Sequence, residues 1–80
     1  MNWTEPQAPN DKCSYNHVTC QTPLGEMLID WKGWKDYPSY GVQLNGYYIT
    51  TAYSLEESKE AAENFIKEKA NELNNFLNNE

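Results

Sequence analysis

The chain has no arginine, one histidine and only two cysteines among its 80 residues. Its six basic residues are all lysines, and twelve acidic residues outnumber them, so the net charge is −6. A protein that binds duplex nucleic acid is expected to show the opposite balance, usually with arginine prominent. The composition therefore predicts no direct binding of duplex nucleic acid.

Long apolar runs are also missing. No run approaches the roughly 20 apolar residues that a membrane-spanning helix requires. No positively charged, apolar signal segment opens the chain, and two cysteines are too few for a disulfide scaffold. We expect a cytoplasmic protein, which forms one domain with a core that is marginal for its size.

The sequence lacks the usual signs of catalysis. Its four glycines are separate from one another, so there is no glycine-rich phosphate loop. His17 is the only histidine, and a Cys–His nucleophile would need it together with an orienting group and oxyanion donors, none of which is recognisable. We expect no enzymatic activity and no cofactor.

One cluster of potential metal ligands is present in Cys13, His17 and Cys20. With a carboxylate such as Asp11, these side chains match the ligand types of a tetrahedral zinc site. A regular strand, however, places Cys13 and Cys20 on opposite faces. We therefore expect ordinary buried or half-buried thiols and no metal.

Residues 1–12 contain Pro6 and Pro9 and show no periodic apolar face. This composition predicts a flexible tail, in which Trp3 is the residue that would dock on the domain. Residues 13–80 are expected to form a single domain.

The strongest local signal in that domain is the pair Asn45-Gly46, which favours a two-residue type I′ hairpin turn. It predicts strands at about 40–44 and 47–51, with Leu44 opposite Tyr47 and Val42 opposite Ile49. Apolar residues at alternate positions predict two further strands, at about 25–32 and 13–20.

Ser54 and Glu57 form a capping box, which predicts a helix over about 55–77. Its apolar stripe, with one lysine in it, comprises Leu55, Ala62, Phe65, Ile66, Lys69, Ala70, Leu73, Phe76 and Leu77. The predicted fold is therefore α+β, with a three- or four-stranded antiparallel sheet and one long C-terminal helix packed on one face.

Such a helix is longer than a hairpin of five-residue strands. The end of its stripe must then lie on the first strands, fold back, or pack on another chain. A homodimer through the C-terminal helix is one of these alternatives.

Four aromatic residues and two lysines lie between residues 31 and 40. Strand alternation assigns Trp31 and Tyr40 to the core. Gly33 and Pro38 instead place the middle of the segment in a connection between strands, where an exposed ring beside a lysine suits a protein contact or a platform for stacking a base. The predicted partner-binding residues are Trp34, Tyr37, Lys32, Lys35 and, on the outer face of the hairpin, Tyr48.

The helix carries a second candidate surface, the acidic face made of Glu56, Glu57, Glu60 and Glu63. These carboxylates either keep a solvated face soluble or imitate the phosphates of a nucleic acid in the basic groove of another protein.

The run from Thr22 to Lys35, the following Tyr-Pro-Ser-Tyr, the Asn-Gly hairpin and the Ser-Leu-Glu-Glu helix start resemble short accessory proteins of tailed bacteriophages. The resemblance covers about residues 22–65, and the Trp-Lys repeat is its distinctive part. It implies a small protein that acts on a host protein in the host cytoplasm, but it transfers no catalytic residue.

Three functions follow as hypotheses. The first is a non-enzymatic inhibitor of a host nucleic-acid enzyme or defence complex, of the anti-CRISPR or DNA-mimic type. The second is a module that binds or sequesters a nucleotide on the aromatic platform. The third is a structural, homodimeric accessory subunit.

Overall fold

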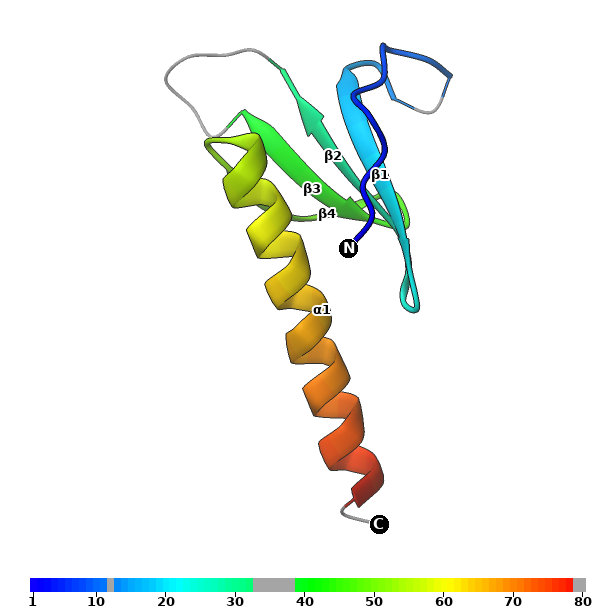
Figure 1. The fold of residues 1–80 in the computed structure, drawn as a ribbon, viewed down its shortest axis with the longest axis vertical. Coiled ribbons are helices and arrows are strands. Elements are labelled where there is room, and N and C mark those ends of the chain that lie inside the picture. Colours follow the sequence, from blue (N-terminus) through cyan, green and yellow to red (C-terminus); the bar gives the residue numbers. More distant parts are fainter. Residues whose placement is uncertain (12, 33–38, 79–80) are drawn as a thin grey trace.

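A computed structural model describes residues 1–11, 13–32 and 39–78. Its elements are β1 (Asn16–Thr22), β2 (Gly25–Trp31), β3 (Tyr40–Leu44), β4 (Tyr47–Ala52) and α1 (Leu55–Asn78). The strands form one antiparallel sheet in the order β1-β2-β3-β4, and α1 packs on one face of it (Figure 1). The predicted α+β fold is confirmed. Among the described residues, no helix is long and apolar enough to cross a membrane.

The turn between β3 and β4 has the predicted geometry, because Asn45 and Gly46 both have positive φ, at 51° and 88°. Asn45 also joins the two hairpins. Its Oδ1 accepts a hydrogen bond from the Glu26 N–H at 3.0 Å, and its Nδ2 donates to the Leu24 carbonyl at 3.1 Å. Gly25 has φ 131°, and a Cβ there would lie 2.2 Å from Asn45 Oδ1. Glycine is therefore required at position 25 for both backbone and steric reasons.

Replacing Gly25 by alanine should lower the free energy of unfolding by about 2 kcal/mol. The matched control is Gly46→Ala, where φ is also positive but nothing lies within 4 Å of the added Cβ. Urea denaturation should therefore show a larger loss for Gly25→Ala than for Gly46→Ala. Equal losses would contradict the steric role of Asn45.

The β3–β4 register agrees with the prediction only next to the turn. Leu44 pairs with Tyr47 as expected, but a bulge between Val42 and Gln43 makes Val42 pair with Thr50. The predicted pairing of Val42 with Ile49 is wrong, because the bulge adds one residue to β4. Ile49 nevertheless packs against the core.

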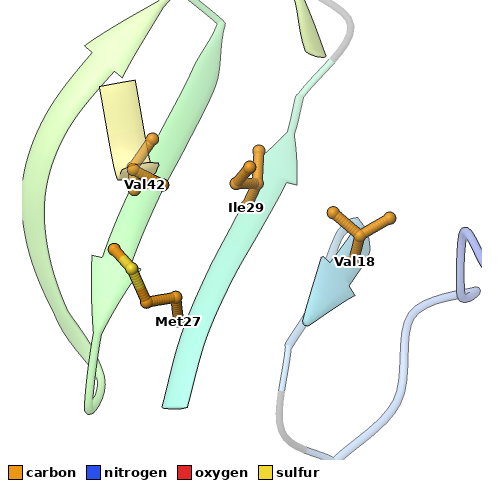
Figure 2. Packing of buried hydrophobic residues seen from close by; sticks show 5 residues of the cluster. Val18, Met27, Ile29 and Val42 are labelled. Atoms are coloured by element: carbon orange, nitrogen blue, oxygen red, sulfur yellow. The ribbon is translucent and has the colours of Figure 1, made fainter. Parts of the chain in front are cut away.

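The core lies between the sheet and the first half of α1. It is formed by buried Val18, Met27, Ile29, Val42 and Ala62, and Figure 2 shows the four strand residues converging from β1, β2 and β3. The predicted inward residues Trp31 and Tyr40 pair across β2 and β3 and pack at the margin of this cluster, with ring centroids 5.9 Å apart.

Helix α1 begins with the predicted cap, since the Ser54 hydroxyl oxygen accepts a hydrogen bond from the Glu57 N–H at 3.1 Å. Small buried residues, Ser58 and Ala62, let the first turns approach the sheet closely. Its 24 residues span about 36 Å, whereas the strands have five to seven residues. The second half of α1 consequently projects beyond the sheet (Figure 1).

The segment that the sequence predicts as a tail lies beside β1. The Gln7 N–H donates to the His17 carbonyl at 2.7 Å, and the His17 N–H donates back at 3.0 Å. The Thr4 N–H donates to the Thr19 carbonyl at 2.9 Å, and Trp3 packs against the core. Backbone hydrogen bonds that the composition does not encode therefore place this segment along the outer side of β1.

Candidate binding surface

The last strand of the sheet offers an exposed, uncharged edge. No charged residue lies between Asp36 and Glu56 in the sequence. The β4 edge, as we call it, consists of exposed side chains on β4 and just after it, namely Tyr47, Tyr48, Thr50, Thr51 and Tyr53. Its three tyrosines are 78%, 52% and 67% exposed. In the part of the chain that the structure describes, β4 pairs only with β3, so its other side is open.

Behind this edge, a buried carboxylate holds one of the tyrosines in place. Asp30 is fully buried on the face of the sheet away from α1. Its Oδ2 accepts hydrogen bonds from the Tyr48 hydroxyl at 2.5 Å and from Gln43 Nε2 at 2.9 Å. Side chains of β2, β3 and β4 are thus joined through a single oxygen atom.

The tyrosine reaches this carboxylate because position 41 has no side chain. A Cβ on Gly41 would lie 2.4 Å from Tyr48 Cε1 and 3.0 Å from Asp30 Oδ1. The ring of Tyr48 therefore lies directly over the backbone of β3. Any larger residue at position 41 would displace the ring from the sheet.

A lysine packs against the same ring. Lys32 Nζ lies 5.4 Å from the ring centroid of Tyr48 and 5.3 Å from that of Tyr15. Both distances are in the range of cation–π attraction. Nearby, His17 is buried, and its Nδ1 donates a hydrogen bond to the Tyr15 carbonyl at 2.8 Å. The contacts with Asp30, Gly41 and Lys32 hold the Tyr48 ring over β3, and about half of the residue remains exposed.

The surroundings of Tyr48 change its acidity. Burial of the hydroxyl, followed by the hydrogen bond to Asp30, raises the pKa of Tyr48 to about 12. A tyrosine in the unfolded chain has a pKa of about 10. The associated stabilisation is therefore complete below pH of about 10 and is lost as the pH rises through about 12.

Alkaline titration should show this shift directly. We expect the ultraviolet absorbance of tyrosinate to include one late component among the six tyrosines, with a pKa of about 12. Tyr48→Phe should remove that component, whereas Tyr47→Phe, the matched control on the same strand, should leave it in place. A late component that persists in Tyr48→Phe would contradict the arrangement.

The potential zinc ligands are not brought together. His17 pairs with Asp30 across β1 and β2, whereas Cys20 pairs with Met27, whose side chain is in the core on the other face. Cys13 precedes β1 and is buried. Within the described ranges, no three His, Cys, Asp or Glu side chains are placed to hold a metal.

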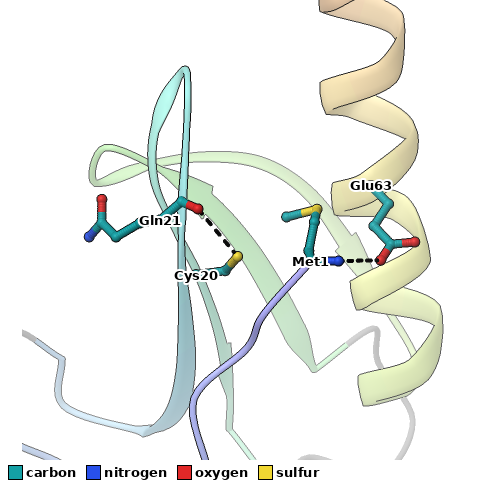
Figure 3. Close-up of polar contacts among 4 residues, drawn as sticks. All are labelled: Met1, Cys20, Gln21 and Glu63. Carbon is teal, nitrogen blue, oxygen red and sulfur yellow. Dashed lines mark hydrogen bonds and ion pairs between the residues drawn. The ribbon is translucent and has the colours of Figure 1, made fainter.

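The acidic face lies on the first half of α1. Glu56, Glu57 and Glu60 are exposed. Glu63 differs, because its Oε1 lies 3.6 Å from the amino group of Met1 (Figure 3). This ion pair joins the N-terminal segment to α1. Figure 3 also draws a separate contact within β1, in which Cys20 Sγ donates to the Gln21 carbonyl at 3.6 Å. Three of the four predicted carboxylates are thus available to a partner.

The structure describes two of the five predicted partner-binding residues, Lys32 and Tyr48, and brings them into contact. The predicted residues Trp34, Lys35 and Tyr37 lie outside the described residues. Sequence reasoning missed Asp30, because strand alternation places it only on the outward face of the sheet, opposite Ile29 and Trp31. The sequence contains only an indirect sign that Asp30 is buried, namely that it is the one acidic residue in the otherwise apolar segment 27–31.

Comparison with known proteins finds no matching family model, no similar curated protein and no similar solved structure.

Proposed function

We propose that this chain is a non-enzymatic interaction protein that binds a host protein through the β4 edge. The observation that carries this proposal is the open, uncharged side of β4 with its exposed tyrosines. An extended segment of a partner can add to such an edge as a further strand, with backbone hydrogen bonds for affinity and side-chain contacts for specificity.

The two edges of the sheet differ in a way that supports binding through β4: the outer side of β1 is covered, whereas in the described chain the outer side of β4 is open. The outer side of β1 carries backbone hydrogen bonds to Thr4 and Gln7. Proteins commonly protect an open edge with lysine, proline or inward-pointing charge, but residues 47–53 contain none of these. An edge without such protection is expected where pairing with another chain is the function.

Anchoring of Tyr48 also favours binding. Its hydroxyl donates a hydrogen bond to Asp30, its ring lies over Gly41, and Lys32 Nζ is 5.4 Å from the ring centroid. A ring that is already fixed loses little conformational entropy when a partner covers it. Tyrosine is also among the residues that most often dominate binding energy at interfaces.

The acidic face indicates the chemistry of the partner. Exposed Glu56, Glu57 and Glu60 extend the acidic surface of a chain whose net charge is −6. Complementary charge speeds association with a basic surface and selects for it. We therefore propose a partner that handles nucleic acid in the host cytoplasm, such as a nuclease or a defence complex, which fits the resemblance to phage accessory proteins.

Affinity capture with matched variants tests the role of the β4 edge. Tagged full-length protein would be used to capture partners from bacterial host lysate, and the captured protein would then be purified and its Kd measured. Replacing Tyr47 and Tyr53 together by serine should weaken binding by at least about tenfold, because both side chains are exposed and lie outside the core.

Two controls separate the surfaces. Glu56→Gln with Glu60→Gln should chiefly slow association and reduce its salt dependence, while Asn71→Ser, at an exposed position of α1, should leave the Kd unchanged. Unaltered binding by the double tyrosine variant would contradict the proposal. A change in tryptophan fluorescence on titration with mono-, di- or cyclic nucleotides would favour the nucleotide-binding alternative instead.

A further inference from the structure

The projecting half of α1 carries an apolar stripe that nothing in the described chain covers. Leu73, Phe76 and Leu77 are 57%, 62% and 60% exposed. Residues spaced by three and four along a helix share one face, so these three continue the stripe of Ile66 and Ala62, which packs on the sheet. The stripe runs along the helix, but the sheet ends partway along it (Figure 1).

An open groove lies next to this stripe, where the ends of the hairpins meet α1. Its volume is about 540 Å³, and it is lined by Leu24, Leu44, Phe65, Lys69, Glu72 and Leu73. Four of these six residues are apolar. The two charged residues neutralise each other, since Lys69 Nζ lies 3.2 Å from Glu72 Oε2.

We propose that a second copy of this chain covers the stripe, with the two α1 helices antiparallel and crossing near Leu73. A twofold axis at Leu73 places residues four positions before it opposite residues four positions after it. Leu77 of each copy then lies opposite Lys69 of the other. Phe76 and Leu77 would enter the groove beside Phe65 of the facing copy, so each chain supplies both the inserted side chains and the groove.

The charge distribution along α1 favours self-association at this end. Residues 55–63 contain four glutamates and one lysine, a charge of −3, whereas residues 64–80 contain three glutamates and two lysines, a charge of −1. Copies of a chain with net charge −6 repel each other, but an antiparallel crossing near Leu73 brings together the halves of α1 that carry less charge. The acidic halves point away from the crossing on opposite sides.

The proposed interface is small. A standard interface buries about 800 Å² on each partner, with about 20–30 residues a side, whereas the proposed contact involves only the projecting turns of α1 and the six residues that line the groove. We therefore expect a reversible dimer with a Kd in the micromolar range. It leaves the β4 edge open, so the dimer does not depend on the proposed partner-binding function.

Sedimentation equilibrium of the full chain, from about 1 μM to about 1 mM, tests this proposal. We expect the average mass to rise from monomer toward dimer. Leu73→Asp should weaken dimerisation by at least about tenfold, because it buries a charge at the twofold axis. The matched control Asn71→Asp adds the same charge on the solvent face and should retain dimerisation near the wild-type Kd.

A wild-type chain that stays monomeric over this range would overturn the proposal, as would a Leu73→Asp variant that dimerises like wild type. Far-ultraviolet circular dichroism would verify that both variants keep the fold, which is expected because both positions are exposed.

Disulfide trapping tests the antiparallel arrangement. When Lys69→Cys and a tagged Leu77→Cys chain are mixed and oxidised, mixed dimers should form in preference to Leu77→Cys homodimers. The native Cys13 and Cys20 are buried and should contribute little background. A preference for Leu77→Cys homodimers would indicate parallel helices and overturn the arrangement.

Discussion

Replacing Ile29 by alanine should lower the free energy of unfolding by about 4 kcal/mol. Ile29 is fully buried at the centre of the core, between Val18 on β1 and Val42 on β3 (Figure 2). Truncation removes apolar contacts and leaves a cavity that neighbouring strands, fixed by their hydrogen bonds, cannot close. A domain of this size has a total stability of only about 4–12 kcal/mol, so the substitution should remove at least about a third of it.

Urea denaturation followed by circular dichroism measures this effect. The control is Leu77→Ala, which removes the end of an exposed aliphatic side chain and should change the stability of the monomer by less than about 0.5 kcal/mol. Both should be measured at low protein concentration, where the proposed dimer is dissociated. Equal effects of the two substitutions would mean that the core has been misplaced.

Replacing Asp30 by alanine should have the second-largest effect, a loss of about 3 kcal/mol. The substitution removes the acceptor for two donors, the Tyr48 hydroxyl and Gln43 Nε2, and leaves a gap on the outer face of the sheet. It should also return the pKa of Tyr48 toward its ordinary value. Asp30→Asn keeps an acceptor oxygen at the same place and should cost less than the alanine substitution.

A double-mutant cycle isolates the Asp30–Tyr48 interaction. Asp30→Ala and Tyr48→Phe remove the two ends of one hydrogen bond, so their combined effect should be smaller than the sum of the separate effects. The pair Asp30→Ala and Leu77→Ala, whose positions are unrelated, should be additive. Additivity within the first pair would contradict the hydrogen bond.

Features set by neighbouring residues were predictable. Asn45-Gly46 specifies its turn because both positions need positive φ, and Ser54 caps the helix three residues before Glu57. The apolar stripe of α1 was equally legible, because three-and-four spacing is a property of one segment. These local signals were sufficient for the α+β fold and for the strand and helix bounds to within a few residues.

Features that depend on distant parts of the chain were not predictable. The bulge beside Val42 shifts β4 by one residue, and the N-terminal segment binds β1 through backbone groups that every sequence has. Asp30 occupies an outward strand position, yet Tyr48 and Gln43 bury it from β4 and β3. The close approach of Tyr48 depends on the absence of a side chain at Gly41, which the sequence alone does not relate to position 48.

The position of the candidate binding surface also depends on distant parts of the chain. The sequence favoured the aromatic residues between β2 and β3, but three of the four exposed tyrosines among the described residues lie at the β4 edge. Of the predicted partner-binding set, Tyr48 belongs to this edge, and Lys32 supports its ring. Tyr47 and Tyr53 could be assigned to this edge only once the order of strands in the sheet was known, because that order leaves β4 with one open side.

Site-specific photo-crosslinking in host cells tests the central claim most directly. A photoreactive phenylalanine analogue at position 53 would replace an exposed tyrosine on the β4 edge, and the same analogue at position 71 would probe the solvent face of α1. We expect a strong crosslink to one host protein from position 53 and none from position 71. Crosslinking from position 71 alone, or the same products from both positions, would contradict binding through the β4 edge.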